Sequence, residues 1–116
     1  MRPLVTRLSG QVQAVGSTAL WTPSAGKRFE LLGYSVIVRW DSTSAAGSRV
    51  TLRDSLTDIF NIASIPVGAL NQMSYSTVNL PGDGYLGSAD DAVLYVNLDA
   101  VATAGGVYVN VWGYEV

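Results

Sequence analysis

The chain has 116 residues, of which 48% are hydrophobic and 14% charged, with a net charge of −2, no cysteine and no histidine. The missing cysteine excludes disulfides and thiolate zinc sites, and the missing histidine excludes imidazole metal sites and the Ser-His and Cys-His nucleophile systems. The small negative charge argues against a nucleic-acid-binding protein, which normally carries a clustered basic stripe. No apolar run approaches the length of a membrane span, and MRPLVTRLSGQVQ lacks the apolar core of a signal peptide. We therefore expect a soluble protein made in a cytoplasm.

The low charge content is the most informative feature of the composition. Charged residues make up 14% of the chain, whereas about 25% is typical. Because surface charge keeps a small protein from associating, we infer that neighbouring proteins cover much of this surface. A weakly charged monomer rich in Ser, Thr, Gly and Asn is the alternative.

Short alternating runs separated by turn residues fill the chain, and helix signals are nearly absent. The segment SLTDIFNIAS suits a strand better than a short helix capped by Ser55, because Ile59, Phe60 and Ile62 precede Pro66. We predict strands near residues 10–15, 18–22, 28–40, 48–54, 58–65, 72–80, 92–99 and 106–115. This pattern predicts an all-β protein with about eight strands, an antiparallel β-sandwich of jelly-roll type, with an immunoglobulin-like sandwich as the main competitor. No linker divides the chain, so residues 1–116 form a single domain in which about residues 1–9 are free to form an extended arm.

Two tryptophans are predicted in or beside the core. Trp21 lies in the second predicted strand, and Trp40 ends the third. Trp40 shares its parity along the strand with Leu32, Tyr34, Val36 and Val38.

The turn TPSAGKRF, residues 22–29, resembles a phosphate-binding loop only at first sight. A Walker-type loop has a glycine five positions before the Gly-Lys pair and a Ser or Thr after the lysine, but these positions hold Trp21 and Arg28. A strand follows the turn instead of the helix that a phosphate site needs. We interpret the segment as a turn in which Pro23 presets φ and Gly26 adopts a backbone angle that other residues avoid.

The acidic stretch PGDGYLGSADD, residues 81–91, is a weak candidate for calcium. Asp83, Asp90 and Asp91 could supply oxygen ligands from one loop. Their spacing matches no EF-hand, and the glycines are explained as loop residues with positive φ. We favour a solvated loop, and we predict no metal and no cofactor. Nothing places two carboxylates across a cleft, so we also predict that the protein is not an enzyme and has no catalytic residues.

The last two predicted strands have clear inner and outer faces. Ala92, Leu94, Val96 and Leu98 form the core face of one strand, and Val107, Val109 and Val111 form that of the other. The intervening loop is compatible with a hairpin. If these strands pair, one outward surface carries six candidate interface residues: Tyr95, Asn97, Tyr108, Asn110, Trp112 and Tyr114.

Such a surface has three interpretations. Tyr and Trp are frequent at protein interfaces, because they bury a large area and keep a polar tip. The rings could instead pack under the protein's own loops or N-terminal segment. They could also stack on sugars while the amides bind hydroxyls. We favour the protein interface, followed by internal packing and then the sugar site.

Both ends of the chain resemble a known class of proteins. The segment LWTPSAGKRFELLGYSVIV resembles openings of small all-β virion proteins of tailed bacteriophages, and VYVNVWGYEV is similar to their closing strand. The resemblance covers about half of the chain and involves structural residues. It implies a capsid decoration or cement protein, or a tail or fibre accessory module, often a symmetric oligomer, and no catalytic residue.

The low charge and the resemblance together predict a virion structural protein. We expect a jelly-roll capsid decoration protein located in the virion and assembled in the host cytoplasm. Its partners would be further copies of itself, with a trimer favoured, and the major capsid protein or other virion proteins, without nucleic acid or membrane. The alternatives are a tail, baseplate or fibre accessory protein, and a carbohydrate-binding module for host attachment.

Overall fold

The computed structural model describes residues 3–40, 47–65, 72–100 and 105–116. These residues form strands and connections, with no helix that could cross a membrane. The strands are β1 Val5–Val12, β2 Gly16–Trp21, β3 Phe29–Trp40, β4 Ser48–Asp54, β5 Thr57–Ile65, β6 Gln72–Asn79, β7 Tyr85–Leu86, β8 Leu94–Leu98 and β9 Gly105–Glu115. An all-β fold is therefore confirmed, and the predicted bounds of most strands agree within a few residues.

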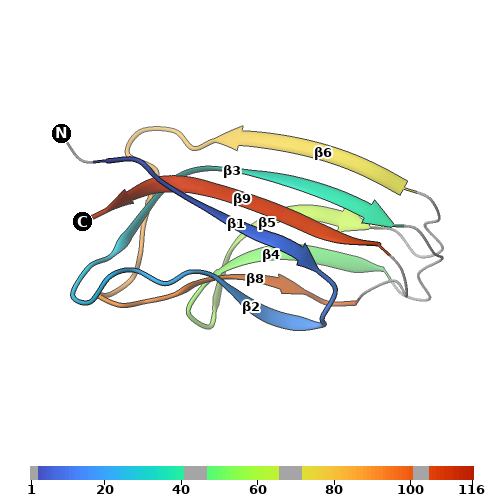
Figure 1. The fold of residues 1–116 in the computed structure, drawn as a ribbon, viewed down its shortest axis with the longest axis horizontal. Coiled ribbons are helices and arrows are strands. Elements are labelled where there is room, and N and C mark those ends of the chain that lie inside the picture. The colour runs from blue at the N-terminus through green and yellow to red at the C-terminus, as the bar shows by residue number, and fades with distance from the viewer. Residues whose placement is uncertain (1–2, 41–46, 66–71, 101–104) are drawn as a thin grey trace.

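The strands form two antiparallel sheets packed face to face, so the predicted β-sandwich is also confirmed (Figure 1). The five-stranded sheet has the order β1-β9-β3-β6, with the short β7 also paired to β3. The four-stranded sheet has the order β2-β8-β4-β5. Strands near the two ends of the chain thus pair with each other, β1 with β9 and β2 with β8, and the middle strands β4 and β5 form a hairpin.

The core lies between the sheets and follows the alternation of each strand. In β8 the inward residues are Leu94, Val96 and Leu98, and in β9 they are Val107, Val109 and Val111, as predicted. The largest fully buried side chains include Trp21, which packs on Phe29 with ring centroids 5.9 Å apart. The core position predicted for Trp21 is therefore confirmed, whereas the side chain of Trp40 lies outside the described residues. Each such large apolar side chain stabilises the fold by about 1.5–3 kcal/mol through burial.

Bulges change the parity of some residues. The register of β3 against β9 shifts between Leu31 and Gly33. Leu31 is therefore fully buried, while Leu32, predicted to share the inward face with Tyr34, is only half-buried. A bulge adds one residue to a strand, and residues on either side of it lose their regular alternation.

The first strand begins earlier than predicted. It starts at Val5 instead of near residue 10, and Val5 lies opposite Gly113 of β9. Much of the segment 1–9, for which the sequence predicts an extended arm, therefore belongs to the five-stranded sheet. The reason is that β9 offers a complete strand edge, to which even the polar run TRLSGQ can hydrogen-bond.

Candidate functional site

The two outward faces of the sandwich differ in chemistry. On the four-stranded sheet, charged side chains pair with each other: Arg49 Nε lies 3.2 Å from Asp99 Oδ2, and Arg53 pairs with Asp58. The four long strands of the five-stranded sheet instead present exposed large apolar side chains: Leu8, Ile37, Tyr75 and Tyr108, which are 74%, 37%, 68% and 36% exposed. We call these four residues the apolar face.

Strand register brings the apolar face together. Tyr108 of β9 lies opposite Ile37 of β3, which lies opposite Tyr75 of β6. Leu8 of β1 lies opposite Asn110 of β9, two residues from Tyr108 on the same face, so Leu8 is a diagonal neighbour of Tyr108. Directly opposed residues have Cβ atoms about 4.5–5.5 Å apart. The four side chains therefore form one contiguous surface that crosses all four long strands.

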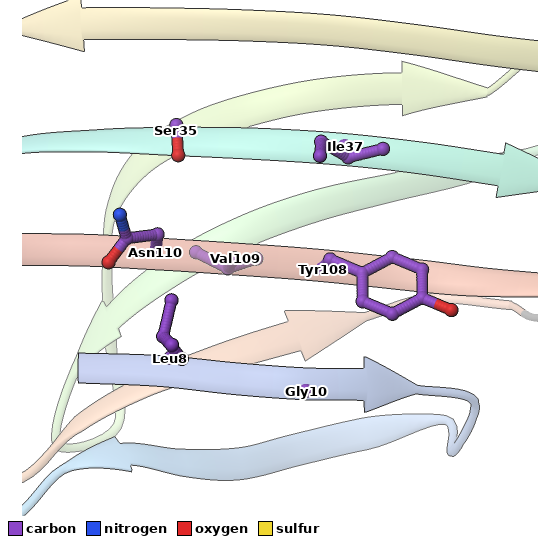
Figure 2. A pocket seen from close by; sticks show the side chains of 7 residues that line it. All are labelled: Leu8, Gly10, Ser35, Ile37, Tyr108, Val109 and Asn110. Atoms are coloured by element: carbon purple, nitrogen blue, oxygen red, sulfur yellow. The ribbon is translucent and has the colours of Figure 1, made fainter.

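A groove of about 340 Å³ runs within this surface. Figure 2 shows Ile37 and Tyr108 toward one end and Ser35 and Asn110 toward the other. The residues around it are Leu8, Gly10, Ser35, Ile37, Tyr108, Val109 and Asn110.

A bulge in β1 shapes one wall of the groove. The register shifts between Leu8 and Gln11, and Gly10 has a φ of 65°, a value that favours glycine. The backbone N–H of Val109 donates to Ser9 Oγ at 2.9 Å, so a side chain replaces a backbone partner at the bulge. Gly10 contributes no side chain, which leaves this wall open beside Tyr108.

Asn110 gives the groove a polar feature. Its Oδ1 is shielded from water and has no hydrogen-bond partner among the residues that the structure describes. A shielded acceptor without a partner costs about 1–3 kcal/mol.

Four of the six candidate interface residues lie on this side of the sandwich, and they differ in role. Tyr108 and Asn110 line the groove. Trp112 is half-buried and covers Gly33: a Cβ at Gly33 would lie 2.4 Å from its indole ring. Tyr114 lies opposite Glu30 and is also half-buried. Part of Trp112 therefore packs on the neighbouring strand β3, and not under a loop or the N-terminal segment.

The expectation that Tyr95 and Asn97 share this surface is wrong. β8 pairs with β2 and β4, whereas β9 pairs with β1 and β3, so the two strands lie in opposite sheets and form no hairpin. Asn97 is buried and accepts a hydrogen bond from Ser17 Oγ at 3.2 Å. A loop long enough for a hairpin is also long enough to cross from one sheet to the other, and alternation within the strands does not distinguish these cases.

Leu8, Ser35, Ile37 and Tyr75 were missed as site residues. The alternation of β3 predicts that Ser35 and Ile37 point away from Val36, and this signal alone would have placed them outward. Leu8 and Tyr75 had no such signal, because their position depends on which strands flank β9 and β3.

The turn 22–28 and the acidic stretch 81–91 hold each other in place. Asp91 Oδ1 accepts the backbone N–H of Gly26 at 2.8 Å, and Asp90 pairs with Arg28 at 3.3 Å. Gly26 has a φ of 75°, as predicted for this turn. Within the described ranges no group of three acidic side chains that could hold a metal ion is found. Two of the three aspartates proposed as calcium ligands thus have structural partners.

The segments LWTPSAGKRFELLGYSVIV and VYVNVWGYEV meet at Glu115. Its Oε1 accepts bonds from Trp21 Nε1 and from the backbone N–H of Ser24, each at 3.2 Å. Burial raises the pKa of Glu115, but the bonds from Ser24 and Trp21 and the charge of Arg7 outweigh this effect, so the pKa lies below its usual 4.5. The contact closes the end of the sandwich.

Asp54 is the most deeply buried acidic residue of the described chain, only 2% exposed. Its Oδ2 accepts the Tyr85 hydroxyl and the Ser88 N–H, both at 2.8 Å, and its Oδ1 accepts the Ser88 hydroxyl at 3.1 Å. Burial, together with the hydrogen bond to Asp54 and the charge of Asp54, raises the pKa of Tyr85 to about 12. Because three donors occupy this carboxylate, it serves to anchor β7 and the following loop to β4.

Comparison of the chain with protein-family models, curated proteins and solved structures finds no match.

Proposed function

We propose that this protein is a bacteriophage virion structural protein without enzymatic activity, specifically a capsid decoration protein. The observation that carries the proposal is the apolar face: Tyr108, Ile37 and Tyr75 in register on three neighbouring strands, with Leu8 beside them on β1, in a lightly charged domain. Contiguous exposed apolar surface marks an interaction site on a soluble domain. The resemblance of LWTPSAGKRFELLGYSVIV and VYVNVWGYEV to phage virion proteins supplies the kind of assembly.

We also propose that the sandwich is a jelly roll. The nested pairing of β1 with β9, β2 with β8, β3 with β6 and β4 with β5 supports this topology. An immunoglobulin-like sandwich would place consecutive strands side by side at the start of a sheet. Here β1 and β2 lie in different sheets.

The mechanism is cementing. Tyr108 and Ile37 would be buried against capsid subunits. Each contact is modest, but symmetry repeats it over the whole shell, and the summed contacts resist pressure from the packaged genome.

A carbohydrate-binding function is the second candidate, because the groove combines the exposed Tyr108 ring with the amide of Asn110 and the hydroxyl of Ser35. Such a mixture can stack on a sugar and bind its hydroxyls. In that case the groove would hold host-wall polysaccharide instead of a capsid loop.

Tyr108→Ala tests both candidates, with Tyr95→Ala on the opposite sheet as the matched control. Heads lacking the protein are incubated with each folded variant, and occupancy is measured alongside retention on host cell walls. A central interface tyrosine contributes about 2 kcal/mol, so Tyr108→Ala should weaken head binding by roughly 30-fold, while Tyr95→Ala should not.

Normal head occupancy with lost wall retention would contradict the decoration function and favour the carbohydrate site. Binding of the wild-type protein to purified tails but not to heads would place it in the tail or baseplate. If neither activity changes in Tyr108→Ala, the apolar face is not the functional surface.

A further inference from the structure

Apart from the two-residue β7, the described residues form four edge strands, and three of them carry features that oppose pairing with another chain. Unpaired N–H and C=O groups along an edge invite further strands, and proteins block them with bulges, charges or proline. β1 has a register shift and Arg7, and β2 has a register shift between Ala19 and Trp21. β5 has two register shifts and Asp58.

The fourth edge strand, β6, has none of these protections. Its sequence, QMSYSTVN, contains no charge and no proline. Its eight residues pair with β3 without a register shift, from Gly33 opposite Asn79 to Trp40 opposite Gln72. Its other side has no strand partner in the described part of the chain, and Tyr75, Ser76, Thr77 and Asn79 are exposed. In Figure 1, β6 forms the outer border of its sheet.

We propose that β6 is a self-association edge, at which the β6 strands of two copies of this chain pair antiparallel across a twofold axis. Across such an axis, each residue of β6 in one copy lies near the same residue, or one close to it in sequence, in the other copy. Two copies of a charged strand would therefore repel each other. The uncharged β6 avoids this repulsion. The two five-stranded sheets would then join into one continuous sheet.

Side chains around Ser76 fit this arrangement. An axis at Ser76 would place Tyr75 of one copy opposite Thr77 of the other, an aromatic residue beside a β-branched one, which stabilises sheets. The Thr77 hydroxyl already donates to the Tyr75 phenol oxygen at 2.6 Å, which holds the exposed ring along the strand. Because Tyr75 belongs to the apolar face, pairing would also merge the apolar faces of both copies into one surface.

This inference is independent of what the apolar face binds, and it predicts a dimeric unit in place of the trimer that we favoured from the sequence. The test is the mass of the full chain in solution over a range of concentrations, measured for the wild type, Ser76→Lys and Ser64→Lys. Ser64 is exposed on the edge strand β5 of the other sheet, so it is a matched control. Ser76→Lys should raise the dimer dissociation constant at least about tenfold, because it adds like charges across the axis, and Ser64→Lys should leave it unchanged.

A disulfide trap gives a second measurement that does not depend on the lysine variant folding. The chain contains no cysteine, so a single Ser76→Cys substitution can form only an intermolecular disulfide. Residues opposed in an antiparallel pair have Cα atoms about 4.5–5.5 Å apart, which suits a disulfide. Ser76→Cys should therefore form a covalent dimer under mild oxidation much faster than Ser64→Cys.

Three results would overturn the inference: a wild type that is monomeric throughout the micromolar range, a dimer that Ser76→Lys does not weaken more than Ser64→Lys, or equal disulfide formation by both cysteine variants. A dimer that is lost only in Tyr108→Ala would assign self-association to the apolar face instead. Loss of head binding in Tyr108→Ala with an intact dimer would support the decoration function and β6 pairing separately.

Discussion

Replacement of Asp54 by alanine is expected to destabilise the fold by about 3 kcal/mol. The carboxylate accepts three hydrogen bonds, from the Tyr85 hydroxyl and from the N–H and hydroxyl of Ser88. A hydrogen bond to a charged group contributes about 1.5–3 kcal/mol. Two effects reduce the cost. Ser88 is exposed, so its N–H and hydroxyl can hydrogen-bond to water in the variant. The variant also avoids the free-energy cost of burying a carboxylate away from water. The net cost therefore lies well below the sum of the three bonds.

Urea unfolding at neutral pH, followed by tryptophan fluorescence, measures this change. The matched control is Asp58→Ala. It removes an exposed carboxylate of the same β4–β5 hairpin, and this carboxylate forms an ion pair with Arg53. An exposed ion pair contributes less than about 1 kcal/mol. If Asp54→Ala costs no more than Asp58→Ala, the carboxylate does not anchor β7 and its loop, and our account of the Asp54 contacts is wrong.

Three further predictions concern pH and packing. Because the folded pKa of Tyr85 is raised from 10.0 to about 12, its contribution to stability is complete below pH 10 and is lost as the pH rises toward 12. Between these pH values, the free energy of unfolding should fall less steeply in Tyr85→Phe than in the wild type. Because the pKa of Glu115 is lowered from 4.5 in the folded protein, its contribution to stability is present above pH 4.5 and is lost as the pH falls through the folded pKa. Glu115→Gln should therefore make the unfolding free energy depend less on pH in the acid range. An unchanged pH dependence would contradict the hydrogen bonds from Trp21 and Ser24. Gly33→Ala should displace the Trp112 indole, lower the free energy of unfolding by about 1–3 kcal/mol and increase acrylamide quenching of tryptophan fluorescence. In a protein that already carries Trp112→Ala, adding Gly33→Ala should cost little. Equal costs with and without Trp112 would refute this packing.

Side-chain alternation was sufficient to predict most strands of this protein and their inward faces. Val107, Val109 and Val111 were assigned to the core from their spacing alone, and the structure buries all three. The reason is local: in any strand, residues two apart share a face, whatever strand lies beside it. The positive φ of Gly26 was predictable for a similar reason, since a tight turn constrains its own few residues.

The candidate site was only half predictable. Tyr108 and Asn110 were identified as outward residues of the last strand, and both line the groove. Tyr95 was placed beside them by an assumed hairpin, but its strand joins the other sheet. Alternation gives the face of a strand and contains no information about its neighbours.

Tertiary structure alone decided which strands meet. β1 and β9 lie near opposite ends of the sequence but pair with each other in the sheet, and this pairing brings Leu8 to the groove. The bulge between Leu31 and Gly33, which buries Leu31 and leaves Leu32 half-buried, belongs to the pairing of β3 with β9. The exposed edge of β6 likewise follows from the strand order, in which β6 pairs with β3 and no described strand lies on its other side. Such choices depend on packing between residues far apart in the sequence, where many pairings satisfy the same alternation and only the complete core selects one.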